Sequence, residues 1–244
     1  MQPLSASELL RVWEEGQGEP PYRQALLLLA AACPGESAEE ITNLSIGHRD
    51  ARLLTLREWT FGPELTSLTA CPACGVRLEF TLNVADIRVA SSESTNPLLH
   101  LAFEDFSIDF RLPNTRDLIE AGRCSDLEHM QRVMIGRCVR NAHKQDEELT
   151  AEYLPSRVVD AVAVKMAEAD PQADTRLALS CPACHHRWQA LFDIVSFFWS
   201  EIDTWAARIL REVHILASAY GWREADILAM SPLRRRMYLG MVGV

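Results

Sequence analysis

The chain has 244 residues, of which 48% are hydrophobic and 24% are charged, so it has enough apolar side chains to fill a core. Its formal net charge of −10 argues against non-specific binding to nucleic acid or anionic membranes, because like charges repel. The longest apolar run, Ala25 to Cys33, is shorter than the roughly 20 residues that a membrane-spanning helix needs. It follows acidic Glu14, Glu15 and Glu19 and is unlike a signal peptide, so we expect a protein kept in the reducing cytosol.

The first part of the chain is predicted to be helical. Ser5 to Glu8 and Ser37 to Glu40 both have the spacing of a capping box, in which serine and glutamate side chains satisfy free amides at a helix start. Pro34-Gly35 ends the apolar helix that lies between these two signals. A further helix is expected from Asp50 to Trp59, before Phe61-Gly62-Pro63.

A period of two then replaces the helical pattern. Apolar and polar residues alternate from Val76 to Val84, which predicts a half-buried strand. The same alternation predicts strands at Phe106 to Leu112, at Arg176 to Ser180 and around Trp188 to Phe192. The polar stretch from Ser91 to Pro97 is expected to be a loop.

Further helices follow in the middle and at the end of the chain. Their expected positions are a short helix capped by Asn114 or Thr115, then Ser125 to about Asn141, Ser156 to Ala169, Ser196 to Tyr220, a short helix from Glu224 and a last one from Pro232. Lys144 to Glu152 is expected to be a charged loop, and Gly221 to be a left-handed cap. The run Arg234 to Arg236 is interpreted as a solvated helix face.

Four cysteines form an internal repeat. Cys71-Pro-Ala-Cys74 and Cys181-Pro-Ala-Cys184 each precede a predicted strand. In a Cys-x-x-Cys turn both sulfurs can face one ion, and two such turns supply the four thiolates of a structural zinc site. The sequence therefore predicts one zinc ion bound by Cys71, Cys74, Cys181 and Cys184, with the two hairpins facing each other as a zinc ribbon.

The residues after each turn refine this prediction. Gly75 suits a left-handed exit from the first turn, and His185 takes that place in the second. A thiol oxidoreductase would instead place Cys-x-x-Cys at a helix start, where the helix dipole lowers the thiol pKa. Here strand patterns follow both turns, which favours structural metal over dithiol chemistry. His185 and His186 are interpreted as the polar edge of the turn rather than as ligands.

No pattern in the sequence indicates catalysis. There is no phosphate-binding glycine loop, no Gly-x-Ser-x-Gly elbow and no His-Glu-x-x-His motif. Four thiolate ligands would leave zinc no open position for a reactive water, so the metal is expected to be structural and the protein not to be an enzyme. Cys33, Cys124 and Cys138 have no partners at ligand spacing and are expected to be buried apolar groups.

These elements predict a predominantly helical α+β protein with a small antiparallel zinc-ribbon sheet and a long C-terminal helix. We expect four segments. Residues 1–63 form an N-terminal helical region, residues 64–87 plus 175–194 a split zinc ribbon, residues 88–174 a mostly helical insertion, and residues 195–244 a C-terminal helical region.

Several stretches together resemble a family of baseplate and hub-assembly proteins from T-even-like contractile phages and related contractile injection systems. They are Ile46-Gly-His-Arg-Asp50, Leu53-Leu-Thr-Leu-Arg57, Phe61-Gly-Pro63, Cys71-Pro-Ala-Cys-Gly75, Leu78-Glu-Phe-Thr-Leu-Asn-Val-Ala-Asp86, Cys181-Pro-Ala-Cys184, Tyr220-Gly-Trp-Arg-Glu-Ala-Asp-Ile-Leu228, Ser231-Pro-Leu-Arg-Arg-Arg236 and Tyr238-Leu239. The resemblance covers most of the chain beyond the first twenty residues.

The resemblance implies a non-catalytic assembly chaperone or minor structural component. Its partners would be baseplate, hub or spike proteins of a phage-tail-like particle, assembled in the bacterial cytosol. It transfers no catalytic residues. The alternative hypothesis is a zinc-ribbon adaptor that binds nucleic acid or the transcription machinery. Arg77 and Arg187 lie near the cysteine turns, but the acidic net charge weighs against this alternative.

Overall fold

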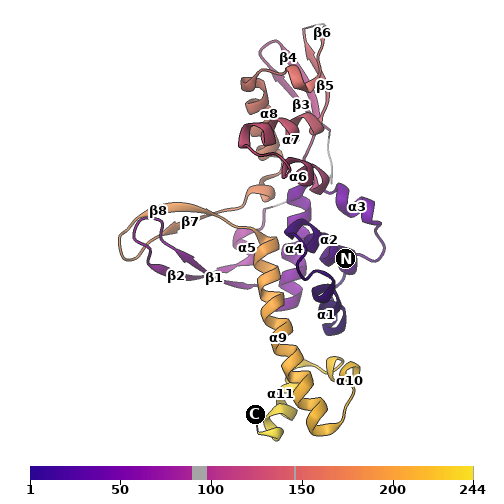
Figure 1. Cartoon of the computed structure of the whole chain (residues 1–244). Helices are drawn as coiled ribbons and strands as arrows, with labels where there is room; N and C mark the ends of the chain where they lie inside the picture. Colours follow the sequence, from indigo (N-terminus) through magenta and orange to yellow (C-terminus); the bar gives the residue numbers. More distant parts are fainter. Residues whose placement is uncertain (90–97, 146, 244) are drawn as a thin grey trace. The chain divides into compact units, whose positions relative to one another are not determined.

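The computed structural model describes residues 1–89, 98–145 and 147–243, and the chain folds into two compact units (Figure 1). Residues 1–35 and 194–244 form the first, here called the helical unit, and residues 36–193 form the second, the mixed unit. The boundary after Gly35 lies inside the expected N-terminal region, and the division into four segments stays a prediction. The described residues confirm the α+β class with small antiparallel sheets and a long C-terminal helix.

The helical unit is organised around one long helix. Its helices are α1 (Ala6–Glu15), α2 (Pro21–Ala32), α9 (Ile194–Tyr220), α10 (Glu224–Leu228) and α11 (Pro232–Val242), and α9 packs against all of the others. Leu10 of α1, Ile209 and Leu216 of α9 and Ile227 of α10 share one buried core. The helix expected from Ser196 to Tyr220 therefore packs its apolar residues against several partner helices. Gly221 has a φ of 67°, which confirms the left-handed cap.

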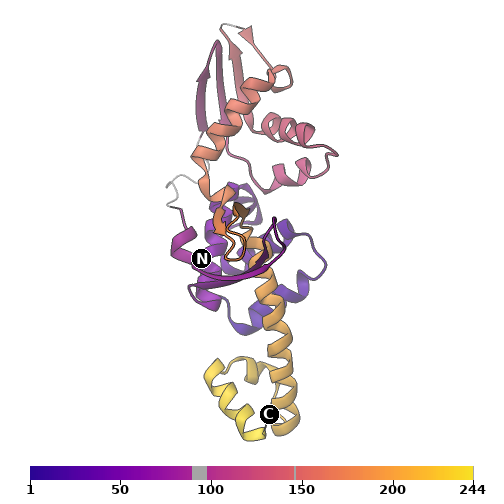
Figure 2. The same ribbon diagram turned by 90° about the vertical axis from the view of Figure 1, so that its left-hand side faces the viewer.

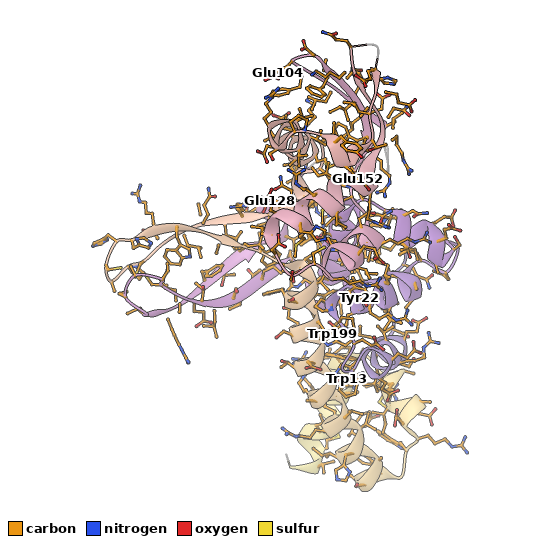
Figure 3. The ribbon with its side chains drawn as sticks, turned by 45° about the horizontal axis from the view of Figure 1, so that its top comes forward. Trp13, Tyr22, Glu104, Glu128, Glu152 and Trp199 are labelled. Carbon is orange, nitrogen blue, oxygen red and sulfur yellow. The ribbon has the colours of Figure 1, made fainter. Side chains whose placement is uncertain are left out.

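Local contacts fix α1 against α9. The Ser5 and Glu8 capping box is present at the start of α1. Trp13 Nε1 donates a hydrogen bond to Asp203 Oδ1 over 2.6 Å, and Trp199 lies on the facing helix (Figure 3). A Cβ on Gly16 would come 2.2 Å from the Trp199 ring, so only glycine allows this close approach.

The arginine run on α11 is not uniformly solvated, which corrects the interpretation from the sequence. Arg235 is buried, and its Nε lies 3.0 Å from Glu212 Oε2 of α9. Its Nη1 also donates to the Met230 carbonyl. Arg234 and Arg236 are exposed, as expected. One arginine of three thus anchors the helix, because a buried guanidinium requires a paired charge.

The mixed unit combines helices with three antiparallel sheets. Its helices are α3 (Ala38–Asn43), α4 (Ile46–Phe61), α5 (Val84–Ile87), α6 (Thr115–Ala121), α7 (Leu127–Cys138) and α8 (Ser156–Ala169), with short 3-10 turns η1 (Ala151–Tyr153) and η2 (Pro171–Asp174). Its strands are β1 (Glu64–Ala70), β2 (Arg77–Asn83), β3 (Leu98–Phe103), β4 (Phe106–Arg111), β5 (Val139–Lys144), β6 (Glu147–Glu148), β7 (Arg176–Ser180) and β8 (Arg187–Leu191).

Strands β3 to β6 form a four-stranded sheet with neighbours in chain order. Ile108 and Phe110 of β4 are fully buried and pack in one core with Ile135 of α7 and with Val158 and Val162 of α8. Helices α7 and α8 cover one face of this sheet (Figure 2). The sheet and its helices form one hydrophobic core of the mixed unit. In the sequence, this core lies between the two cysteine turns.

This sheet adds strands that the sequence did not predict to residues 88–174, the segment described as a mostly helical insertion. Only β4 was expected; the helix expected to reach Asn141 ends at Cys138, and residues 139–144 form β5 instead. Ala142 of β5 lies opposite Ile108 of β4, so pairing with a distant strand overrides the local helical pattern. The expected Ser91 to Pro97 loop lies outside the described residues.

Helix boundaries differ from prediction where polar caps decide them. α4 begins at Ile46 rather than Asp50, because Ser45 Oγ accepts a hydrogen bond from the His48 amide. Val84 starts α5 instead of ending a strand, since the Asn83 side chain caps that turn. The N-cap of α7 is Asp126 rather than Ser125.

One contact between α4 and η2 determines where the second hairpin begins. The Gly47 amide donates to Asp170 Oδ2 over 2.8 Å. A Cβ at Gly47 would lie 2.0 Å from Asp170 Oδ1 and 3.0 Å from the Ala173 amide nitrogen. Because η2 runs directly into β7, this close approach positions the base of that hairpin against α4.

We expect Gly47→Ala to lower the free energy of unfolding by about 1–3 kcal/mol, because the added methyl group overpacks the Asp170 contact. Alanine normally stabilises a helix relative to glycine, so the sign is opposite to the usual one. Gly240→Ala is the matched control, since Gly240 lies in α11 with nothing within 4 Å of its added Cβ. Chemical denaturation should show a gain of up to about 1 kcal/mol for the control. Equal effects of the two substitutions would contradict the close contact.

A largely buried carboxylate, that of Asp50, lies beside this contact, with 13% of its side chain exposed. Burial raises the pKa of Asp50 to about 6, although the Arg49 guanidinium, whose Nε is 2.8 Å from Asp50 Oδ1, opposes the shift. The carboxylates of Asp193 and Asp170 add to the rise. The folded chain therefore holds a proton on Asp50 at pH values where the unfolded chain has released it.

A raised pKa stabilises the fold at low pH, and the stabilisation is lost as pH rises through the folded-state value. We expect the unfolding free energy of the wild type, relative to Asp50→Asn, to fall by about 1–1.5 kcal/mol between pH 5 and pH 8. Denaturation curves of both proteins across that range give this difference, and Asp226→Asn, an exposed change on α10, is the control. A pH-independent difference would contradict the assignment.

Candidate metal centre

Two hairpins carry the four cysteines of the repeat. β1 pairs with β2 and β7 pairs with β8, each as a separate two-stranded antiparallel sheet, whereas the sequence predicted one small sheet. In Figure 1 the hairpins run beside each other and their turns meet. Leu78 and Phe80 of β2 and Leu179 and Trp188 of the second hairpin are only half-buried. Burial of apolar surface along the hairpins is therefore modest.

The two turns have the same backbone geometry. The Gly75 amide donates to the Cys71 carbonyl and the His185 amide to the Cys181 carbonyl, both over 2.9 Å. The exit residues Gly75 and His185 have φ values of 73° and 60°, as predicted from the repeat. Histidine thus occupies a left-handed position that favours glycine, at some conformational cost.

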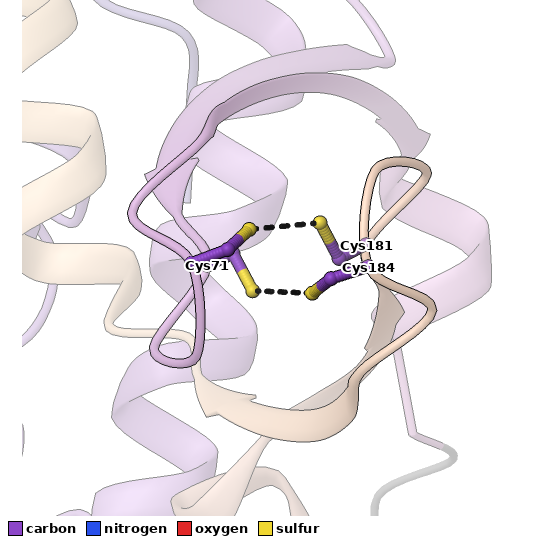
Figure 4. Close-up of side chains that lie close together, drawn as sticks. Cys71, Cys181 and Cys184 are labelled. Atoms are coloured by element: carbon purple, nitrogen blue, oxygen red, sulfur yellow. Dashed lines mark hydrogen bonds between the residues drawn. The ribbon is translucent and has the colours of Figure 1, made fainter.

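The turns bring all four thiols together. The Sγ atoms of Cys71, Cys74, Cys181 and Cys184 lie within 4.8 Å of one another. Each close pair joins the two hairpins: Cys71 Sγ is 3.7 Å from Cys184 Sγ, and Cys74 Sγ is 3.6 Å from Cys181 Sγ (Figure 4). The first cysteine of each turn is buried and the second is exposed. Residues distant in sequence therefore converge on one small volume.

Backbone amides lower the pKa of both thiols in the second turn, whereas the neighbouring sulfurs lower the pKa of Cys181 and raise that of Cys184. The Cys184 amide, assisted by that of Ala183, lowers the pKa of Cys181 to about 7. The His186 amide lowers the pKa of Cys184, but the sulfurs of Cys74, Cys181 and Cys71 outweigh it and raise that pKa to about 12. Four thiolates at this spacing repel one another, so a cation is needed to hold all of them deprotonated.

The two shortest sulfur–sulfur distances are compatible with the edges of a tetrahedral metal site. Zinc–thiolate bonds of about 2.3 Å imply sulfur–sulfur separations of about 3.8 Å along the edges of the tetrahedron. The measured separations of 3.6 and 3.7 Å are close to this value. Soft thiolate donors select zinc, copper(I) or iron–sulfur chemistry over calcium or magnesium. The donor set and the spacing are thus compatible with a zinc ion.

The other cysteines stand apart from this cluster. Cys33 and Cys138 are buried, as expected, whereas Cys124 is only partly buried. Burial raises the pKa of Cys138 to about 12, and the nearby Asp117 carboxylate adds to the rise. Among the described residues, neither His185 nor His186 belongs to the metal-compatible group; the His186 ring stacks on Trp188, with centroids 6.0 Å apart.

A buried glutamine connects the bases of the two hairpins, and sequence reasoning missed it. Gln172 Oε1 accepts from the Val89 amide over 2.8 Å, while its Nε2 donates to the Ile87 carbonyl and to Thr175 Oγ1. Ile87 ends the helix that follows β2, and Thr175 precedes β7. A single glutamine after Asp170-Pro171 carries no recognisable local signal, so only the fold reveals its role.

The site and fold define a helical α+β protein whose two short hairpins meet at a four-cysteine cluster. Residues 6–199 match the model of a family described as T4 bacteriophage base plate protein. Because the match spans well over half of the sequence, the chain belongs to this family, which confirms the family resemblance; the motifs between Tyr220 and Leu239 lie beyond the matched residues. No curated protein and no solved structure gives a significant match. The family match ends within α9, before α10 and α11 begin.

Proposed function

We propose that the protein is a non-catalytic structural or assembly component of the baseplate or hub of a contractile, phage-tail-like particle, with one structural zinc ion bound by Cys71, Cys74, Cys181 and Cys184. Membership of the base plate protein family is the observation that carries the role. The convergence of four thiols supports the metal. We expect assembly in the bacterial cytosol, with baseplate, hub or spike proteins as direct partners.

Zinc would supply folding free energy here rather than reactivity. A two-stranded hairpin is at best marginally stable in water, and the facing sides of these hairpins are only half-buried. An ion held by two thiolates from each turn would fix the hairpins to each other and offset the repulsion between the sulfurs. Four protein ligands leave no open coordination position, which favours a structural over a catalytic site.

The two other hypotheses from the sequence receive less support. An oxidoreductase would place its reactive cysteine at a helix start, but β2 and β8 follow the two turns. A nucleic-acid adaptor would use the exposed Arg77 and Arg187, yet family membership and the net charge of −10 favour a protein partner.

None of the described helices combines the length and apolar character that crossing a membrane requires.

The metal proposal predicts about one zinc per chain in protein purified without chelator, as measured by atomic emission. Cys71→Ser and Cys181→Ser should each abolish stoichiometric binding, give poorly soluble protein and lower the melting temperature by roughly 10 °C, because the site's folding free energy is lost. Cys124→Ser is the matched control, since this partly buried cysteine lies outside the cluster. Metal-free cysteine variants that stay soluble and fully folded would refute a structural metal.

The assembly role predicts specific partners. Affinity purification of the tagged chain from its native cells, followed by mass spectrometry, should recover baseplate, hub or spike proteins. Cys71→Ser should reduce that recovery, because the partner surface depends on the folded hairpins, whereas Cys124→Ser should not. Recovery of RNA polymerase or salt-sensitive retention of nucleic acid instead would reject the assembly role and favour the adaptor hypothesis.

A further inference from the structure

Helix α11 exposes a row of large apolar side chains. Leu233, Met237 and Met241 are 63%, 60% and 69% exposed. They are spaced four residues apart, so they lie on one face of the helix. By contrast, α7 and η1 each carry one large apolar residue that is this exposed, Leu127 and Tyr153. We call Leu233, Met237 and Met241 the apolar stripe of α11.

The opposite side of α11 is firmly held, so the stripe is presented by an ordered helix. Arg235 is 4% exposed and pairs with Glu212 of α9. The Tyr238 ring packs edge-on against Trp222, with centroids 4.8 Å apart, and against Tyr220 at 5.8 Å. Ser231 Oγ caps the first turn by accepting from the Arg234 amide. These contacts fix which face points outward.

The charge around the stripe indicates the chemistry of its partner. α11 contains three arginines and no acidic residue. Arg235 is used within the fold, whereas Arg234 and Arg236 are exposed and form no ion pair with a described carboxylate; Arg234 lies over the Tyr238 ring. An apolar helix flanked by acidic residues would match both features. A second copy of this chain would instead bring arginine against arginine.

We propose that the apolar stripe of α11 docks an amphipathic helix with acidic flanks from another baseplate protein, an inference that rests on the proposed function. Methionine is unbranched and polarizable, which suits a surface that adapts to a partner helix. The surface lies beyond residue 199, where the match to the family model ends.

The test uses the full-length protein and two labelled synthetic helices of about 18 residues, with the same leucine stripe but flanked by glutamates in one and by lysines in the other. Fluorescence anisotropy should show a dissociation constant about tenfold lower for the glutamate peptide. Leu233→Gln with Met237→Gln should abolish binding, and Arg236→Glu should remove the preference for glutamate. The matched control is Leu127→Gln on α7, where leucine is 79% exposed, and it should bind normally.

Several outcomes would overturn the proposal. The proposal fails if neither peptide binds or if both bind equally. It also fails if sedimentation shows a dimer of the chain that Met237→Gln dissociates, or if the chain binds phosphatidylglycerol vesicles through α11. Circular dichroism confirms that each variant is folded. If the wild type and the Leu233→Gln, Met237→Gln variant retain baseplate proteins equally in the co-purification, this inference fails while the proposed function stands. If neither retains them, the proposed function itself fails.

Discussion

The convergence of four sulfur atoms is the contact on which the hairpin pair depends. Within the part of the chain that the structure describes, neither hairpin belongs to a larger sheet, and their facing sides are only half-buried, so strand pairing and apolar contact leave each of them weakly supported. Two connections hold them together: the cysteine turns at one end and Gln172 at the other. The proposed zinc ion and the buried side-chain amide of Gln172 would thus stabilise the pair of hairpins, as a hydrophobic core stabilises the elements elsewhere in the chain.

Local chemistry made part of this structure predictable from the sequence. The capping boxes at Ser5 and Ser37 mark real helix starts, and Asn114 caps α6 as expected. The cysteine repeat predicted two matched turns, including the left-handed backbone at His185. In each case the determining contacts span only a few residues, so the pattern contains most of the information needed.

Features that depend on distant partners were missed. β5 forms because it pairs with β4, which lies about 30 residues earlier in the chain. The local sequence of residues 139–141 predicts the end of a helix instead. Nothing in the run Arg234 to Arg236 shows that its middle residue is buried against Glu212. Gln172 likewise gains its role only from Ile87 and Val89. In these three cases, contacts between residues that are distant in sequence determine the structure, and the local sequence pattern does not.

The topology of the hairpin pair has a consequence for how the chain can vary. The chain leaves through the first cysteine turn, builds the β3–β6 sheet with its helices, and returns through the second turn more than 100 residues later. Both ends of that insertion are therefore anchored at a fixed separation. Because loop-closure entropy costs only about 0.6 kcal/mol per doubling of length, insertions of different size are compatible with the same anchor. Residues 98–169 can thus change in length without altering the anchor formed by the two hairpins, provided that the contacts of α6 with α3 and of α8 with η2 are kept.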